Sequence, residues 1–310
     1  MFLTLFRKVL GPSEAHVSKS VFGKAMAKIA HLPSLPDTST RAMALANDPG
    51  ATLADFSNLI KRDGAIATAT LKLANSPMYR VGKPVEELHQ AVLRLGLRTC
   101  SDLVTSIGMR GLFRNAKRET VERCELLWRH SFFTASLATQ LNVALKLGFR
   151  GEEFTAGLLH DLGRFMIALV VPTGADAGDP LDFNEDEHRM AEEEKVLGTN
   201  HCALGFRYCQ LNSLPPSVAL CNLMHHEPGE AVKQGREGHQ LVSLIAAADH
   251  IANYVHRTHR IKDYDATLNE GLALLACGDR ARWDKLINSM PQLTKAALRA
   301  TREVLKTGAI

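Results

Sequence analysis

The heptapeptide GLLHDLG, residues 157–163, places a polar pair inside an apolar segment. His160 and Asp161 interrupt small and aliphatic residues on both sides, where a polar side chain is costly unless it has a partner. Outward from this pair, apolar residues recur with a helical period, whereas the alternation and the β-branched runs typical of a sheet are almost absent. The sequence therefore predicts an all-α protein that buries a polar site.

The composition is that of a globular protein of one or two domains. The 310 residues are 45% hydrophobic and 23% charged, with a formal net charge of +4, which is close to average usage. The longest apolar run, residues 165–171, is far shorter than the roughly 18 residues of a transmembrane helix, and residues 1–8 lack the order of a secretory signal. The six cysteines form no C-x-x-C pair, which fits a reducing compartment, and the charge is too mild to indicate nucleic-acid binding. We expect a cytoplasmic protein that binds neither membrane nor nucleic acid.

Turn residues divide the helical pattern into segments. Four short helical segments are expected within residues 52–113, with a break at Gly96, followed by a polar linker and a long helix over about 119–147 that Gly148 closes. One further helix is expected through His160, followed by a loop from Pro172 to about Asn184. Other helices are expected near 185–197, 201–211, 217–226 and, after a Gly-rich loop, 241–255, with an amphipathic helix docked at the C-terminus. These segments predict four parts: an N-terminal segment at 1–20, a helical subdomain at 21–115, a second helical subdomain at 116–265, and C-terminal helices packed on it at 266–310.

Residues 176–194 hold nine acidic side chains against one base, Arg189. We expect this region to form a surface loop and an exposed helix face. Such a surface would not attract a polyanion.

Seven histidines and aspartates stand in apolar helical surroundings: His130, His160, Asp161, His201, His225, His226 and Asp249. Imidazole nitrogens and carboxylate oxygens together suit Fe, Mn or Zn. An adjacent His-Asp pair can let the carboxylate bridge two ions, which would clamp a phosphoryl oxygen and generate a hydroxide.

A structural interpretation competes with the metal site. A single buried histidine is usually a structural residue, and His225 and His226 cannot both point one way on a helix. Spacing alone therefore leaves both interpretations open. The neighbours His201 and Cys202 do not by themselves indicate a thiol nucleophile, because adjacency in sequence is not the through-space geometry that a Cys–His pair needs.

The segment from Leu32 to about Pro228 resembles the HDOD domain, a bacterial signalling relative of the HD phosphohydrolases. The matching pieces are LPSLP at 32–36, IKRD at 60–63, LKLANS at 71–76, AVLRLG at 91–96, WRHS at 128–131, GLLHDLG at 157–163, GTNHCALG at 198–205, LP at 214–215 and HH at 225–226. The resemblance implies two packed helical subdomains, the second an HD-type helical bundle, and a role in bacterial signal transduction.

The related HD-GYP group, which hydrolyses cyclic di-GMP at a metal centre, has the ligand pattern His, His-Asp, His, His-His and Asp. The same seven residues are the counterparts here, which implies one or two divalent ions (Fe, Mn or Zn), with Asp161 and Arg164 as catalytic candidates. Arg164 stands where that group has a lysine; it keeps a cation near the pocket and can fork to a phosphate. The Gly-Tyr-Pro element is missing, because the chain reads Pro228-Gly229-Glu230 at that point.

Two functions follow from these features. The first is a regulatory HDOD module without catalysis, which binds a signalling protein or a small nucleotide through the HD-like pocket. The second is a metal-dependent phosphohydrolase acting on a nucleotide or cyclic dinucleotide. The N-terminal subdomain, which a hydrolase does not need, favours the first, and the intact set of potential ligands favours the second.

Overall fold

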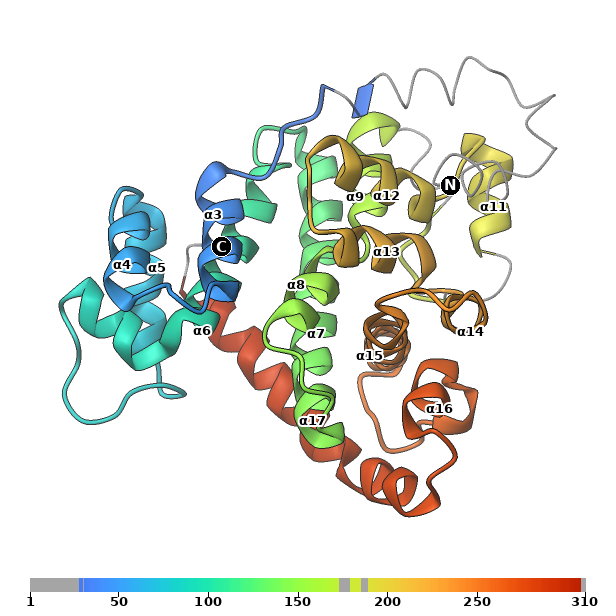
Figure 1. The fold of residues 1–310 in the computed structure, drawn as a ribbon. Helices are drawn as coiled ribbons and strands as arrows, with labels where there is room; N and C mark the ends of the chain where they lie inside the picture. The colour runs from blue at the N-terminus through green and yellow to red at the C-terminus, as the bar shows by residue number, and fades with distance from the viewer. Residues whose placement is uncertain (1–27, 30, 173–178, 185–188, 308–310) are drawn as a thin grey trace.

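The computed structural model describes residues 28–29, 31–172, 179–184 and 189–307, so the segment expected at 1–20 lies outside the described residues. Every regular element in these ranges is helical (Figure 1). The α-helices are α3 (Asp37–Asn47), α4 (Leu53–Ile60), α5 (Gly64–Ala74), α6 (Leu88–Gly111), α7 (Arg118–Leu145), α8 (Glu152–Leu159), α9 (Leu162–Val170), α11 (Arg189–Leu197), α12 (His201–Leu211), α13 (Pro216–Met224), α14 (Pro228–Lys233), α15 (His239–Thr258), α16 (Glu270–Ala276) and α17 (Arg280–Lys306). A 3₁₀ turn, η2, covers Ala266–Leu268. The predicted all-α class is confirmed.

Local side chains determine where the N-terminal helices begin and break. Thr52 and Asp55 form a reciprocal capping box at the start of α4, which satisfies two backbone N–H groups that the first turn leaves free. Asp63 caps α5 by accepting from two backbone N–H groups. Within α6, Gly96 adopts φ 79° and ψ 158°, a conformation that only glycine adopts at no steric cost. The break predicted at Gly96 is confirmed, and it bends α6 into two arms.

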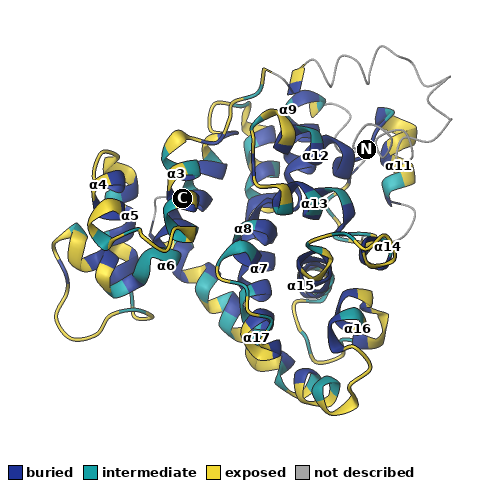
Figure 2. Ribbon diagram, viewed as in Figure 1, coloured by how far each residue is buried: buried dark blue, intermediate teal, exposed yellow. Residues whose placement is uncertain are grey.

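Helix α7 is the element on which the two subdomains meet. Its Trp128 and Phe132 belong to an apolar cluster shared with the N-terminal helices and α9, whereas Leu137 and Leu141 belong to a second cluster shared with α15. Figure 2 shows α7, α8 and α12 as largely buried. Helix α17 packs along α7, which confirms the docked C-terminal helix. The four domain boundaries stay a prediction.

The structure corrects the expected elements at three places. The helix expected through His160 ends at Leu159, and residues 165–170 of the apolar run belong to a separate helix, α9, because the backbone at Asp161 leaves the helical region (φ −101°, ψ 22°). A short helix, α14, begins at Pro228 where a loop was expected; proline suits a first helical position because its missing N–H would be unpaired there. Helix α7 ends two residues early, with Lys146 rather than Gly148 in the left-handed cap position.

Two observations complete the fold. The helix expected near 185–197 is described from Arg189 onward, and residues 185–188 lie outside the described part. None of the helices in the described ranges combines the length and the apolar character that a bilayer crossing requires.

Candidate metal centre

The seven residues singled out in the sequence lie at helix ends or on inward helix faces around one interior point. His130 lies on α7 and Asp249 on α15, whereas the other five flank the ends of α8, α9, α12 and α13. All are buried except His226, which is half-buried. Gly163 lets α9 approach α12 closely, because a Cβ there would lie 1.7 Å from the backbone oxygen of His201. The helix ends that carry the site are therefore held together by backbone-to-backbone contact.

One group of donors centres on Asp249. Its Oδ1 lies 2.8 Å from His130 Nε2 and 3.2 Å from His160 Nε2. Its other oxygen accepts from the amide of Asn253 at 3.0 Å. Asp249 thus gathers two imidazoles from segments far apart in the sequence.

A second group centres on Asp161, whose two carboxylate oxygens face different histidines. Oδ2 lies 3.6 Å from His160 Nε2 and 3.9 Å from His130 Nε2. Oδ1 lies 3.6 Å from His225 Nε2 and 3.7 Å from His201 Nε2. Oδ1 and His225 Nε2 are both buried with no hydrogen-bond partner, which a native interior rarely tolerates. A divalent ion at this place would satisfy both atoms, and the carboxylate has the orientation of a bridge.

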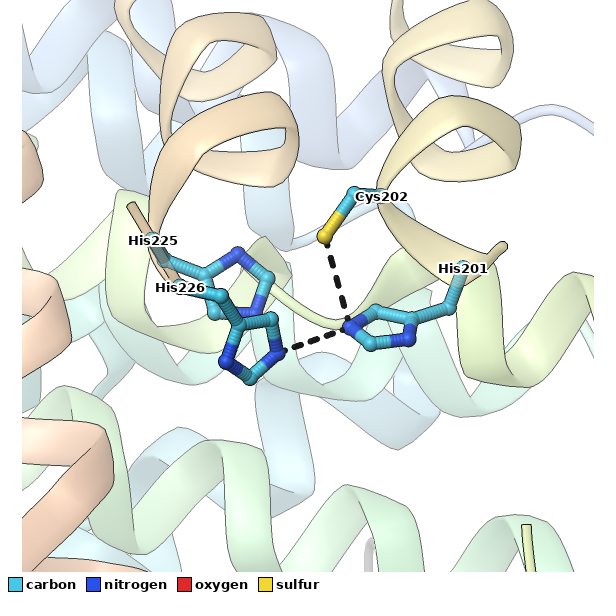
Figure 3. A group of neighbouring side chains, drawn as sticks. All are labelled: His201, Cys202, His225 and His226. Carbon is cyan, nitrogen blue, oxygen red and sulfur yellow. Dashed lines mark hydrogen bonds between the residues drawn. The ribbon is translucent and has the colours of Figure 1, made fainter. Parts of the chain in front are cut away.

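The histidine pair after α13 departs from the sequence expectation. Helix α13 ends at Met224, and His225 follows it as the C-cap residue with backbone angles that are still helical (φ −65°, ψ −21°), yet the two rings do not turn apart. Their ring centroids are 4.1 Å apart, and His226 Nε2 lies 2.9 Å from His201 Nε2 (Figure 3). Both imidazoles therefore offer a nitrogen to one group of donors, together with His201 and Cys202.

The outer hydrogen bonds set which imidazole nitrogen faces the centre. The Nδ1 atoms of His160 and His225 donate to the backbone oxygens of Gly157 and Cys221, at 2.7 and 2.9 Å. His201 Nδ1 donates to Glu193 Oε2 at 2.8 Å. In each case Nδ1 is used by an outward hydrogen bond and Nε2 faces the other donors, which is the arrangement that metal-binding histidines almost always have. The donor set therefore fits a metal ion.

The charges of the centre also suit a cation. Burial would raise the pKa of Asp161, but His160 and Arg164 hold it well below its usual range. Burial lowers the pKa of His225, and burial together with His225 lowers that of His226 well below its usual value. Burial likewise disfavours protonated His160, but the carboxylates of Asp161 and Asp249 prevail and raise its pKa to about 9. Without metal, the centre thus holds anionic carboxylates beside a protonated His160, and a bound ion would take the place of the proton on its Nε2.

Arg164 is buried beside this centre and bound by carboxylates of the chain itself. Its Nη1 donates to Asp161 Oδ2 at 3.1 Å, and its Nε and Nη2 fork to the two oxygens of Asp179 at 2.9 and 2.7 Å. Asp179 also accepts from Arg123, and the ring of Phe183 lies against His130 with centroids 5.2 Å apart. Residues 179–184 thus cover the centre.

This arrangement corrects the surface expected at 176–194. Asp179 and Glu193 are 2% and 1% exposed, and each holds a residue of the centre, Arg164 and His201 respectively. Sequence reasoning missed both, because they stand in a run of acids whose other described members are mostly exposed. The one local signal was Glu193, which is placed on the same helix face as Arg189 and Leu197, both also buried.

Comparisons with known proteins identify the family of this chain. A model of the HDOD domain matches residues 32–228, nearly two thirds of the chain. The chain belongs to the HDOD domain family. An uncharacterized protein from Treponema pallidum (strain Nichols) is 26% identical over 227 residues, which are 72% of this chain but 42% of that protein, so the chain spans less than half of this relative.

Solved structures share the fold. An HDOD domain protein of unknown function from Geobacter sulfurreducens superposes with a TM-score of 0.67 at 23% identity, covering 91% of this chain and 98% of that one. A protein from Shewanella amazonensis SB2B, provisionally named a phosphohydrolase, gives 0.65 at 21% identity with the same coverage. One from Marinobacter aquaeolei VT8, provisionally named a signal transduction protein, gives 0.67 at 15% identity, covering 92% of this chain and 65% of that one.

Proposed function

We propose that this HDOD protein is a bacterial regulatory module of the cytoplasm that holds one or two divalent metal ions in the HD-like pocket and binds a signalling protein or a small nucleotide without hydrolysing it. The observation that carries this proposal is the fork between Arg164 and Asp179. A guanidinium in this position would bind a substrate phosphate through the same two-bond geometry. Here a carboxylate of the chain fills that place, which supports a binding role over turnover.

The residues of the chain have separate roles in this proposal. His130, His160 and Asp249 would hold one ion, and Asp161, His201, His225 and His226 a second. A bound ion would supply positive charge for an anionic group of the ligand. Asp161 also holds Arg164 next to the ions, and Phe183 excludes water by lying over His130.

A metal-dependent phosphohydrolase is the second candidate, and the complete donor set supports it. All seven potential ligands are present and converge, although a module that only binds partners has no need of them. The Shewanella protein with this fold carries a phosphohydrolase name. In this alternative Arg164 has to leave Asp179 before it can bind a phosphate.

Two measurements on the purified full chain decide between the candidates. The first is the metal content together with hydrolysis of cyclic di-GMP and bis(4-nitrophenyl) phosphate after loading with Mn²⁺ or Fe²⁺. The second is binding of inorganic phosphate by calorimetry to the wild type, to Asp179→Asn and to the control Asp182→Asn. Asp182 lies on the same segment, but its exposed side chain pairs with Arg189 and not with Arg164.

The regulatory proposal expects bound metal, no turnover, and phosphate affinity that rises at least tenfold in Asp179→Asn only. Turnover by the wild type that Asp161→Ala abolishes would overturn it in favour of the hydrolase. Protein that holds no metal after loading would reject the metal-binding part of both candidates. Equal phosphate affinity in all three proteins would remove the argument from Arg164.

A further inference from the structure

The thiol of Cys202 lies within the group formed by His201, His225 and His226, in a position that sequence reasoning gave no role. One atom from each of these four residues lies within 4.8 Å of the others, and Figure 3 shows the sulfur directed toward the imidazoles. Cys202 is 3% exposed. Its Sγ lies 3.5 Å from His201 Nε2 and 3.8 Å from Met190 Sδ.

The separations can be compared with those of a tetrahedral zinc site. With Zn–S about 2.3 Å and Zn–N about 2.05 Å, a tetrahedral angle places sulfur and nitrogen about 3.5 Å apart and two nitrogens about 3.3 Å apart. The distance from Cys202 Sγ to His201 Nε2 is 3.5 Å. His201 Nε2 and His226 Nε2 are 2.9 Å apart, so an ion would spread this pair by a few tenths of an ångström.

A second observation points to a ligand at this place. His225 Nε2 is buried without a hydrogen-bond partner, and its Nδ1 is already used by the backbone oxygen of Cys221. Its free nitrogen therefore has a lone pair directed into the same group as Cys202.

We propose that Cys202, His201, His225 and His226 form a closed three-nitrogen, one-sulfur site for a thiophilic divalent ion such as zinc. This inference rests on the metal-binding part of the proposed function. On binding, the Cys202 thiol loses its proton to solvent and the thiolate becomes the fourth ligand. Sulfur ligation selects zinc over manganese or magnesium. Four protein ligands leave no open position for water, as in structural rather than catalytic zinc sites.

The competing fourth ligand is Asp161, whose Oδ1 lies 3.7 Å from His201 Nε2. The two alternatives differ in what the ion's spectrum shows. A cobalt ion bound by a thiolate gives an intense sulfur-to-metal charge-transfer band in the near ultraviolet, whereas a cobalt ion bound by nitrogen and oxygen only does not.

The experiment titrates the metal-free full chain with Co²⁺, then displaces it with Zn²⁺, in the wild type, Cys202→Ala and Cys209→Ala. Cys209 is a buried thiol on the same helix α12 outside this group of donors, so it is the matched control. The wild type and Cys209→Ala should show the charge-transfer band and release a thiol proton. Cys202→Ala should lose the band and bind zinc at least ~100-fold more weakly, the upper end of what losing even an outer-shell partner costs.

The outcomes separate this inference from the proposed function. Cobalt binding to the wild type without the band, or a band that Cys202→Ala retains, overturns the thiolate ligand but leaves the metal-binding module standing. A wild-type chain that binds no cobalt overturns both. If Cys202→Ala does not fold, Cys202→Ser replaces it, since serine keeps the size of the side chain but gives no such band.

Discussion

Replacing Gly163 with alanine tests the close contact on which the candidate centre depends. The added methyl carbon would lie 1.7 Å from the backbone oxygen of His201 and 2.5 Å from its carbonyl carbon. Because both are main-chain atoms, no side-chain rotation relieves the overlap, and α12 must move away from α9 by roughly 1.5 Å to restore an ordinary contact. Overpacking of this kind costs about 3 kcal/mol, the upper end of the usual range, which corresponds to a fall in Tm of about 6 °C at ~2 °C per kcal/mol.

The same movement should also damage metal binding, because metal sites tolerate ligand displacements of only about 0.2 Å. His201 is the first residue of α12 and moves with it. The assay is thermal unfolding plus metal content for the wild type, Gly163→Ala and Gly64→Ala. Gly64 begins α5 and has nothing within 4 Å of its added Cβ, so that variant should match the wild type. A Gly163→Ala protein that is equally stable and equally metal-loaded would refute the described packing of α9 on α12.

Three further substitutions have smaller, separate effects. Burial and the neighbouring His130 lower the pKa of His256 to about 3, so below pH 6.5 the unfolded chain takes up a proton that the folded chain resists. The free energy of unfolding therefore decreases as the pH falls, by about 2 kcal/mol at pH 5 for this group. His256→Phe should flatten the decline of Tm between pH 7 and pH 5. An unchanged slope would contradict the lowered pKa of His256. Tyr208→Phe removes the hydrogen bond from the hydroxyl to the Pro33 backbone oxygen and should cost about 1 kcal/mol in urea unfolding. Thr52→Ala removes the α4 cap and should cost a similar ~1 kcal/mol, whereas no loss would show that the cap is unimportant.

Most helices could be predicted from local sequence because their signals are local. The cap at Thr52 and the break at Gly96 depend on one or a few adjacent residues, so periodicity and turn chemistry were sufficient. The kink at Asp161 could not be predicted in this way. It follows from packing α9 against α12 through Gly163, a contact between residues distant in the sequence.

The residues of the candidate centre likewise include some that local sequence predicts and others that only the packing of the helices reveals. His130, His160 and Asp249 could be predicted, because each places a polar group on an apolar helix face. The orientation of His226 could not, because it depends on the packing of α13 beside α12, which brings the His226 ring to His201. The roles of Asp179 and Glu193 could not be predicted, because the composition of an acidic run does not tell which of its acids will be buried. Their burial becomes evident only in the assembled structure.

The buried position of Asp179 bears on how activity in this fold can be held back. In the proposed function, every potential ligand is retained, and the carboxylate of Asp179 occupies the place on Arg164 that a substrate phosphate would take. An anionic partner that displaces Asp179 would have to compensate the positive charges of both Arg164 and Arg123, which Asp179 now pairs with. A ligand with two or more anionic oxygens could do so, whereas a neutral one could not. The proposed regulatory function therefore predicts a ligand with an acidic group, whether it belongs to a nucleotide or to a side chain of a protein partner.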